Sequence, residues 1–233
     1  MRSRYPIHLE IAAPVAMFAR PDTGAAPVSF PVPTWSAAKA CFESVAALFG
    51  PDRPNAFVSP TSVEIWRPLR YERYKVNYRG PLRKPDQVAS GTSYQLPATV
   101  LVDVCYRIHA ECISLRPSAA DTNPAHALKE IFERRLKRGQ SKYTPCLGWR
   151  EFLPSYFGPF REPRSDPDAP VLQGGLDLDV PAMLLSMWDA PIRGRYRPTF
   201  SNLKVVRGVL QYPQARVVDG LLQFDSEEKR HAG

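Results

Sequence analysis

The sequence lacks the cysteine patterns that mark metal sites and disulfide frameworks. Its four cysteines, Cys41, Cys105, Cys112 and Cys146, form no CxxC pair. Structural zinc needs clustered thiolate or imidazole ligands, and a disulfide framework suits a secreted chain. We therefore predict reduced thiols, most of them packed as small hydrophobic groups, with no metal and no other cofactor.

Long apolar runs are also missing. No stretch of the chain is long and apolar enough to cross a bilayer, and the opening MRSRYPIHLEIAAPVAMF mixes polar and apolar residues instead of forming a signal-peptide core. We predict a cytoplasmic protein with no membrane partner.

Acidic residues are scarce relative to basic ones. The 23 Asp and Glu face 31 Lys and Arg, so that the formal net charge is +8 and the pI is near 9.5. Such a charge favours a polyanionic partner. Hydrophobic residues make up 44% of the chain, which is enough for a globular core, and the 25 prolines indicate long irregular connections.

The first half of the chain alternates strands and helices. Residues 7–18 begin as a strand in which Ile7, Leu9 and Ile11 share one face and His8 and Glu10 the other. We further predict a short strand at 28–32, a helix over 37–49 capped by Thr34 or Ser36, and a strand over 56–71 that is broken at Ser59 and Pro60.

Residues 99–115 give the clearest strand signal. Val104, Tyr106 and Ile108 fall on one face, and Arg107 and His109 fall on the other. A strand with one largely polar face is typical of an antiparallel sheet. The order of elements predicts an α+β domain with helices on one side of an antiparallel sheet, for which the RNA-recognition-motif-like (ferredoxin-like) arrangement is the nearest common layout.

Two regions depart from this pattern. Residues 72–98 are polar, basic and rich in glycine, proline and tyrosine, so we predict a projecting loop or hairpin that orders on a partner. After a proline-rich linker, residues 171–188 and 198–224 read as strands, with Gly208 in a tight turn. We predict a main domain over 1–160 and a linker with a small C-terminal β extension over 161–233.

A basic helix and an aromatic loop follow the long strand. Leu128, Ile131, Phe132 and Leu136 recur at helical spacing, and the helix breaks at Gly139. Cationic side chains can neutralise phosphates and flat rings can stack on bases, which suits a single-stranded polynucleotide. The alternative is a solvated helix that runs into a packed loop.

The predicted RNA contacts come from this region and from two positions before it. They are Arg20, Lys39, Arg134, Arg135, Lys137, Arg138, Lys142, Tyr143, Trp149 and Arg150. A solvated charge is the alternative for each cation. Tyr143 with Lys142 could also supply a general acid and a cation.

Three segments resemble one family. The segments FARPDTGAAPVSFPVPTWSAAKACFES, VLVDVCYRIHAE and FERRLKRGQSKYTPCLGWREF are similar, in the same order, to the CRISPR-associated Cas5 family in its type I-C branch. The resemblance implies an RNA-recognition-motif-like domain of the repeat-associated (RAMP) superfamily, with a thumb-like hairpin at 72–98. It also implies a subunit that grips the 5′ handle of CRISPR RNA at one end of the Cascade complex, beside the backbone subunit and the large subunit, with target DNA as an indirect partner in antiviral defence.

The resemblance also implies where RNA cleavage would occur. Members of this branch cut precursor RNA without a metal, and the family places Tyr or His at the end of the first helix and a Lys-His pair early in the central helix. These positions fall on Ala46, Ala127 and Leu128 here, and none of these side chains can transfer a proton. His126 with Lys129 is the nearest substitute, and an ordinary surface histidine is the alternative. His8 and His109 are each either RNA contacts or solvated.

Two function hypotheses follow. In the first, the protein binds the 5′ handle of a guide RNA and caps one end of the complex without cleaving. In the second, it is a metal-independent endoribonuclease that leaves a 2′,3′-cyclic phosphate and uses non-standard residues. A basic structural protein unrelated to guide RNA is a third class.

Overall fold

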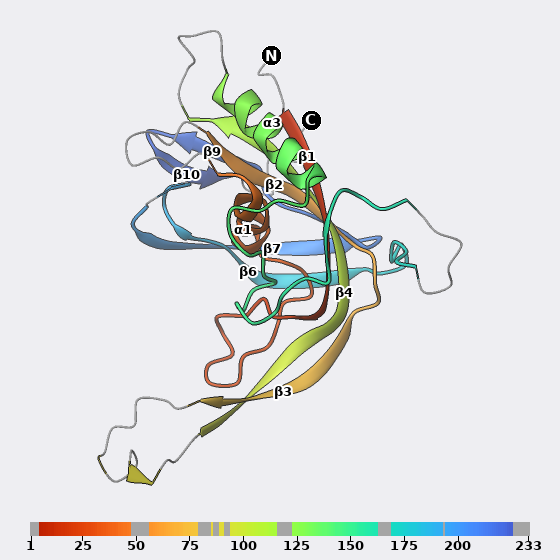
Figure 1. Ribbon diagram of the computed structural model, residues 1–233. Coiled ribbons are helices and arrows are strands. Elements are labelled where there is room, and N and C mark those ends of the chain that lie inside the picture. Colours follow the sequence, from red (N-terminus) through yellow and green to blue (C-terminus); the bar gives the residue numbers. More distant parts are fainter. Residues whose placement is uncertain are drawn as a thin grey trace.

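The computed structural model describes residues 5–47, 56–78, 85, 89–90, 94–115, 123–162, 169–192 and 194–225. Within these ranges the chain forms one large antiparallel sheet, a separate two-stranded ribbon and few helices (Figure 1). The predicted α+β class with an antiparallel sheet is confirmed at this level.

The centre of the sheet is the long strand β4 (Tyr94–Ser114). It pairs with β1 (Tyr5–Ala16) on one side and β2 (Ala56–Ile65) on the other, and β5 (Tyr156–Gly158) adds to the far side of β1. The register of β1 and β4 is unbroken from the pair Tyr5 and Cys112 to the pair Ala16 and Leu101. The break predicted at Ser59 and Pro60 is a bulge between Pro60 and Ser62 in β2, at a proline that has no N–H to give to the ladder.

Two helices lie on the same side of this sheet. The helix α1 (Trp35–Val45) begins where the Thr34 hydroxyl accepts a hydrogen bond from the backbone N–H of Ala37, and α3 (Pro124–Lys137) begins at Asn123. Phe42 of α1 and Phe132 of α3 are both buried, and their ring centroids are 5.3 Å apart. This contact joins the two helices above the inward-facing residues of β1 and β4.

The predicted helix over 37–49 is shorter in the structure, and the predicted strand over 28–32 is absent. Ala46 is extended, with φ −144° and ψ 125°, so α1 ends at Val45. Residues 28–32 make only isolated bridges, between Ala19 and Ser29 and between Val28 and Thr99. Pro27, Pro31 and Pro33 alternate through this segment and have no N–H group for a continuous ladder.

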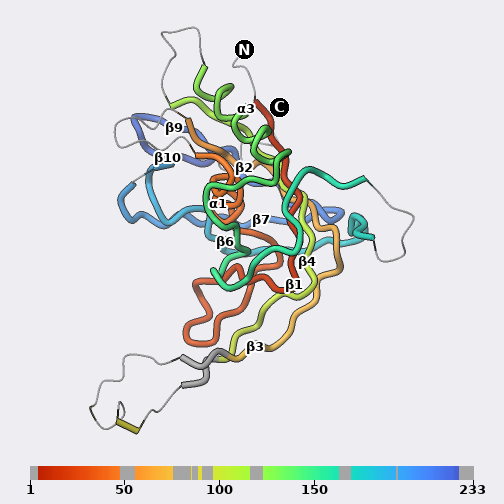
Figure 2. Tube along the Cα trace, viewed as in Figure 1, coloured from red at the N-terminus to blue at the C-terminus, as the bar shows by residue number. Residues whose placement is uncertain are grey.

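The segment 72–98 falls largely within a two-stranded ribbon. β3 (Arg70–Tyr78) pairs with the first part of β4, from the pair Arg70 and Val102 to the pair Tyr78 and Tyr94, and the ribbon leaves the body of the molecule (Figure 2). Most of the predicted tip, residues 79–93, lies outside the described residues. At the base of the ribbon Asp103 has φ 51° and accepts hydrogen bonds from Arg67 and Arg70.

The C-terminal strands extend the same sheet. β8 (Val209–Gln211) pairs with β2, followed by β7 (Tyr196–Val206) and β6 (Leu178–Trp188), and Gly208 makes the predicted turn with φ 76°. β9 (Ala215–Val218) and β10 (Leu221–Phe224) form the separate ribbon. The division at residue 160 into two domains stays a prediction.

Candidate nucleic-acid interface

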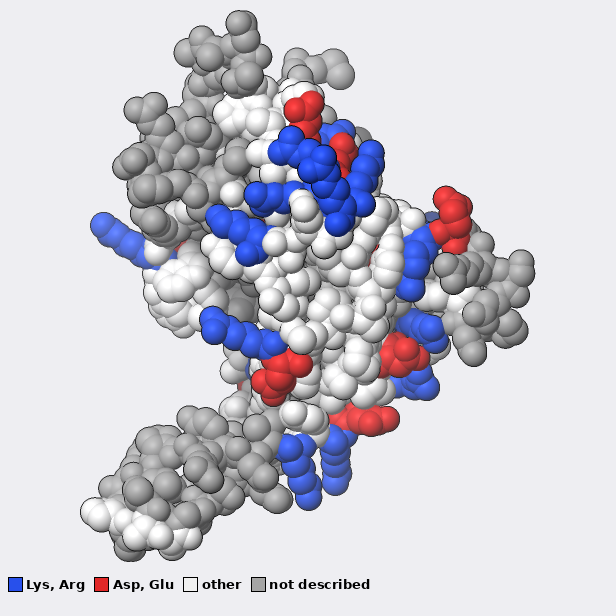
Figure 3. Space-filling model, in the orientation of Figure 1, with Lys and Arg blue, Asp and Glu red and all other residues white. Residues whose placement is uncertain are grey.

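The helix α3 presents one buried and one basic face. The Asn123 side chain accepts from the Ala125 backbone N–H at 3.0 Å, and Pro124 occupies the first turn, where a missing N–H costs nothing. Leu128, Phe132 and Leu136 are buried. Basic side chains gather over the opposite surface of this helix (Figure 3). In its last turn and cap, the exposed basic residues are Arg134, Lys137 and Arg138. Positive charge at this end also complements the helix dipole.

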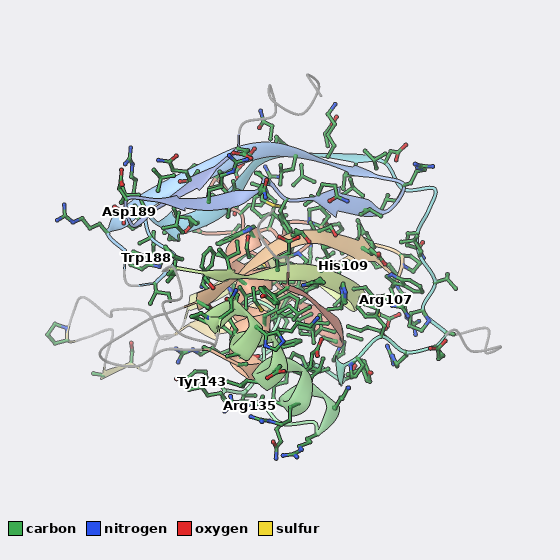
Figure 4. The ribbon with its side chains drawn as sticks, turned by 90° about the horizontal axis from the view of Figure 1, so that it is seen from above. Arg107, His109, Arg135, Tyr143, Trp188 and Asp189 are labelled. Atoms are coloured by element: carbon green, nitrogen blue, oxygen red, sulfur yellow. The ribbon has the colours of Figure 1, made fainter. Side chains whose placement is uncertain are left out.

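Arg135 has a different role from its neighbours. Its Nη1 donates to the carbonyl oxygen of Val45 at 2.8 Å, which joins the end of α3 to the end of α1. The chain then turns at Gly139, which has φ 62°, and the backbone N–H groups of Lys142 and Tyr143 donate to the carbonyl oxygen of Ser44 at 2.7 and 3.0 Å. Lys142 and Tyr143 are therefore held against the end of α1, and Tyr143 lies near Arg135 (Figure 4).

A pocket opens between α1 and this loop. It has a volume of about 270 Å³ and is lined by Ala40, Glu43, Ser44 and residues 143–146. Tyr143 is 58% exposed, and the Lys142 Nζ lies 5.3 Å from the centroid of its ring. An exposed ring beside a cation and a small, mostly apolar pocket can stack a nucleobase while the ammonium group contacts the backbone.

The other aromatic residues of the loop are packed against the base of the ribbon. Phe152 is buried, its ring stacks on Trp149 at 5.6 Å, and both contact Tyr74 of β3. The packing interpretation therefore holds for Phe152, while Trp149 is partly exposed. Gly148 allows the loop to approach the backbone of Met17 closely, because a Cβ at this position would lie 1.7 Å from the Met17 carbonyl oxygen.

The remaining predicted contacts have acidic partners or lie outside the helix. The Arg20 guanidinium makes a bidentate contact with the Asp22 carboxylate, in which Nε donates to Oδ1 at 3.1 Å and Nη2 donates to Oδ2 at 2.7 Å. Lys39 is buried and pairs with Glu43, whose pKa burial raises above its ordinary value. Arg150 is exposed in the loop after Gly148. The structure thus groups Arg134 to Tyr143 into one surface, and Arg20 lies apart on the loop after β1.

The three positions to which the resemblance assigned proton transfer are packed in the structure. Ala46 and Leu128 are buried and Ala127 is partly buried, so these three residues contribute apolar surface only. The exposed ring of His126 lies edge-on to Tyr5 of β1 at 5.6 Å, with its Nε2 3.6 Å from Glu130. Lys129 lies 3.7 Å from Glu133.

A chain of proton-carrying side chains crosses the polar face of the sheet. His8 of β1 faces His109 of β4 with their Nδ1 atoms 2.9 Å apart, and His109 Nε2 lies 2.9 Å from Glu64 of β2. The alternation of polar residues along each strand could have indicated this cluster. What the sequence could not give is the register, which sets His8 directly opposite His109.

Charges from α3 also act on this cluster. The pKa of His8 is lowered by its partial burial and then by the charges of His109 and Lys129, against smaller opposing effects of Glu133 and Glu64. Lys129 and Glu133 are one turn apart on α3. The predicted pair His126 and Lys129 therefore faces the end of β1 that carries Tyr5 and His8.

A second set of charges on the same face is neutralised internally. Glu10 is 1% exposed and accepts hydrogen bonds from Arg107 at 3.0 Å and from Arg161 at 2.5 Å. The Arg107 guanidinium lies over the ring of Trp66 at 3.5 Å and near that of Phe160 at 4.8 Å. Arg107 and His109 follow each other along the same face of β4 (Figure 4). These ion pairs fasten the segment after β5 to the sheet.

All four cysteines are free. Cys41, Cys105 and Cys112 are buried, and burial raises their pKa values to about 12, 11 and 12. Cys146 is partly exposed at the pocket beside Tyr143. Among the described residues, no group of His, Cys, Asp and Glu could hold a metal ion, and no helix is long and apolar enough to cross a membrane.

Known proteins are similar to this chain in sequence and in fold. A family model described as CRISPR-associated protein (Cas_Cas5), of the Cas5d type, matches residues 7–224. The chain is 35% identical over 219 residues to a protein named CRISPR pre-crRNA endoribonuclease Cas5d from Thermus thermophilus, covering 91% of this chain and 88% of that protein. A protein of the same name from Mannheimia succiniciproducens is 26% identical, with 89% of this chain and 94% of that protein covered. The fold is similar to the functionally uncharacterized protein SMU1763c from Streptococcus mutans, with a TM-score of 0.63, 18% identity and coverage of 91% and 94% of the two chains.

Proposed function

Because this chain belongs to the Cas5d family of CRISPR-associated proteins, we propose that it is the guide-RNA-binding subunit of a type I-C Cascade complex. It grips the 5′ handle of CRISPR RNA and caps one end of the complex, beside the backbone and large subunits, and meets target DNA only indirectly. The observation that carries the proposal is the continuous surface of exposed cations on α3 that leads to Tyr143 and its pocket.

The fold supports this role. The strand order β5-β1-β4-β2, with α1 and α3 on one side, supports a ferredoxin-like domain of the RNA-recognition-motif kind. The β3–β4 ribbon supports the assignment of a thumb-like hairpin. The pairing of β6, β7 and β8 supports the assignment of a C-terminal β extension. In this arrangement the handle lies on the helical side, between the end of α3 and the base of the thumb.

The test reverses three charges that make no bond to α1. The variant Arg134→Glu, Lys137→Glu, Arg138→Glu is expected to lose about 100-fold or more in affinity for the chain's own repeat RNA near 0.1 M salt, since each reversal removes one phosphate contact and adds repulsion. The matched control, Arg195→Glu, Arg197→Glu, Lys204→Glu, changes the same number of charges on the β6–β7 hairpin. Equal affinities for the two variants would refute the proposed surface.

Cleavage of precursor RNA is a second candidate function. The two named relatives favour it, since both carry the name pre-crRNA endoribonuclease. Ala46, Ala127 and Leu128 supply no proton-transfer group, so cleavage must use other residues. Incubation of the purified chain with its repeat RNA in EDTA tests this function, and a product that ends in a 2′,3′-cyclic phosphate would establish it.

A further inference from the structure

We propose that His8 is the general base of a metal-independent RNA cleavage site, with His109 and Glu64 as its positioning residues. The proposal rests on the second candidate function and names the residues that would carry it. It replaces the positions at Ala46, Ala127 and Leu128 with a site on β1, β4 and β2.

The hydrogen-bond partners assign the protons of this chain. A carboxylate has no proton to give, so His109 donates from Nε2 to Glu64 Oε1, and when both imidazoles are neutral the Nδ1 of His109 is left as an acceptor. In this neutral state His8 donates from its own Nδ1 across the 2.9 Å contact. A neutral imidazole has one N–H, so His8 Nε2 carries a lone pair. This is the group that a general base needs.

The hydrogen-bonded series of His8, His109 and Glu64 is also rigidly held. The second oxygen of Glu64 accepts from the indole N–H of Trp66 at 2.7 Å, so both carboxylate oxygens are fixed. The Phe160 ring centroid lies 5.6 Å from that of His8 and 5.4 Å from that of His109. A base that is oriented by a second imidazole and a carboxylate follows the same logic as the triads of hydrolases, in which the acid fixes the tautomer and stabilises the imidazolium.

His8 lies at the β1 edge of the sheet, on the face opposite the one that α3 covers. His8 is exposed, and Lys129 of α3 is close enough for its charge to lower the pKa of His8. Lys129 and Arg138 are nine positions apart on α3 and its cap, or about 14 Å along the axis. An RNA strand that follows α3 from Arg138 to Lys129 would have to pass round the β1 edge of the sheet to meet His8.

The reaction balances with water as the only other participant. His8 Nε2 removes the proton of a ribose 2′-OH, and the 2′ oxygen forms a bond to the adjacent phosphorus while the bond from phosphorus to the 5′ oxygen breaks. The leaving oxygen takes a proton from water, and the hydroxide so formed recovers the proton held by His8. The Lys129 ammonium group stabilises the charge on the phosphorane. The products end in a 2′,3′-cyclic phosphate and a 5′-hydroxyl.

The decisive variant is His8→Asn. An asparagine amide can keep the hydrogen bond to His109 but has no basic nitrogen, so the cleavage rate in EDTA should fall by about 100-fold or more while RNA affinity is kept. His8→Ala should fall similarly and recover in part with added imidazole. Asp179→Asn on β6 is the control for a surface substitution far from the site.

The pH profile tests the positioning residues. The acidic limb of the pH–rate profile should lie below pH 6.5, because the pKa of His8 is lowered. Glu64→Gln or Glu133→Gln should move this limb to lower pH, and Lys129→Gln should move it to higher pH, since these charges act on His8 with opposite signs. His109→Gln should lower the rate and move the limb as well.

The outcomes separate this proposal from the function on which it rests. If the unaltered chain cleaves and His8→Asn cleaves equally well, the His8 site is wrong and the cleavage function stands. If His126→Ala alone abolishes cleavage, the base lies on α3. If the unaltered chain leaves its repeat RNA intact, the cleavage function fails and His8 has no catalytic role.

Discussion

The surface of α3 and the polar face of β1 and β4 are both rich in charge, but they use it in opposite ways. Arg134, Lys137 and Arg138 point into solvent. On the sheet, Arg107 and Arg161 close on the buried carboxylate of Glu10. Exposed cations can form ion pairs with a ligand, whereas buried cations that are paired within the protein stabilise the fold. The number of cations in a segment therefore says little about its role until their partners are known.

The strongest test of this comparison removes the acid that closes the sheet cluster. Glu10→Gln leaves Arg107 and Arg161 without their anion in a buried setting, and we expect a loss of about 3–5 kcal/mol in the free energy of unfolding, measured by urea denaturation. The exposed pair of Arg20 and Asp22 offers the matched control, since Asp22→Asn should leave the free energy of unfolding nearly unchanged. Similar losses in the two variants would remove the distinction between the regions.

The next effect concerns the ring at the end of the basic surface. Tyr143→Ala should weaken binding of the repeat RNA by about 1–3 kcal/mol if the ring stacks on a base, measured by titration of labelled RNA. Tyr143→Phe keeps the ring and should bind nearly as well. Weak binding by the phenylalanine variant would instead assign the energy to the hydroxyl group.

A smaller effect distinguishes single cations. Arg138→Gln should lower the slope of log affinity against log salt by about 0.7, the value for one phosphate contact on a single strand. Lys204→Gln changes a cation that already has Asp179 at 3.4 Å and should leave the slope unaltered. Identical slopes for these two variants would show that α3 has no privileged contact with the backbone.

The smallest expected effect is the pH dependence that His8 contributes to stability. Its pKa in the folded protein is lowered, so below pH 6.5 the unfolded chain binds more protons at this position than the folded one. The His8 contribution should therefore reduce the free energy of unfolding as the pH falls through that range. Denaturation of His8→Asn at pH 7.5 and pH 5.5 should show a smaller decline than the unaltered protein, and an equal decline would contradict the assignment.

Much of the fold followed from local patterns in the sequence. The alternation of Val104, Tyr106 and Ile108 predicted the central strand, and the spacing of Leu128, Phe132 and Leu136 predicted the buried face of α3. The prediction of a strand at 28–32 was wrong. Its apolar residues alternate as in a strand, but its prolines have no N–H to donate to a ladder.

The candidate sites were only partly predictable. The cations and Tyr143 were visible because exposed groups leave a local signal. The meeting of His8, His109 and Glu64 depends on pairing between strands that are far apart in the chain, and a register cannot be read from either strand alone. The same limit hid Glu10, the internal partner of Arg107, whereas Glu43 lies one helical turn after Lys39.

The contrast among the four thiols makes the Tyr143 pocket observable in solution. Three thiols are shielded and hard to ionise, so a maleimide should modify Cys146 well before the others while the protein stays folded. A fluorophore attached there would report whatever enters the pocket, without any engineered attachment point.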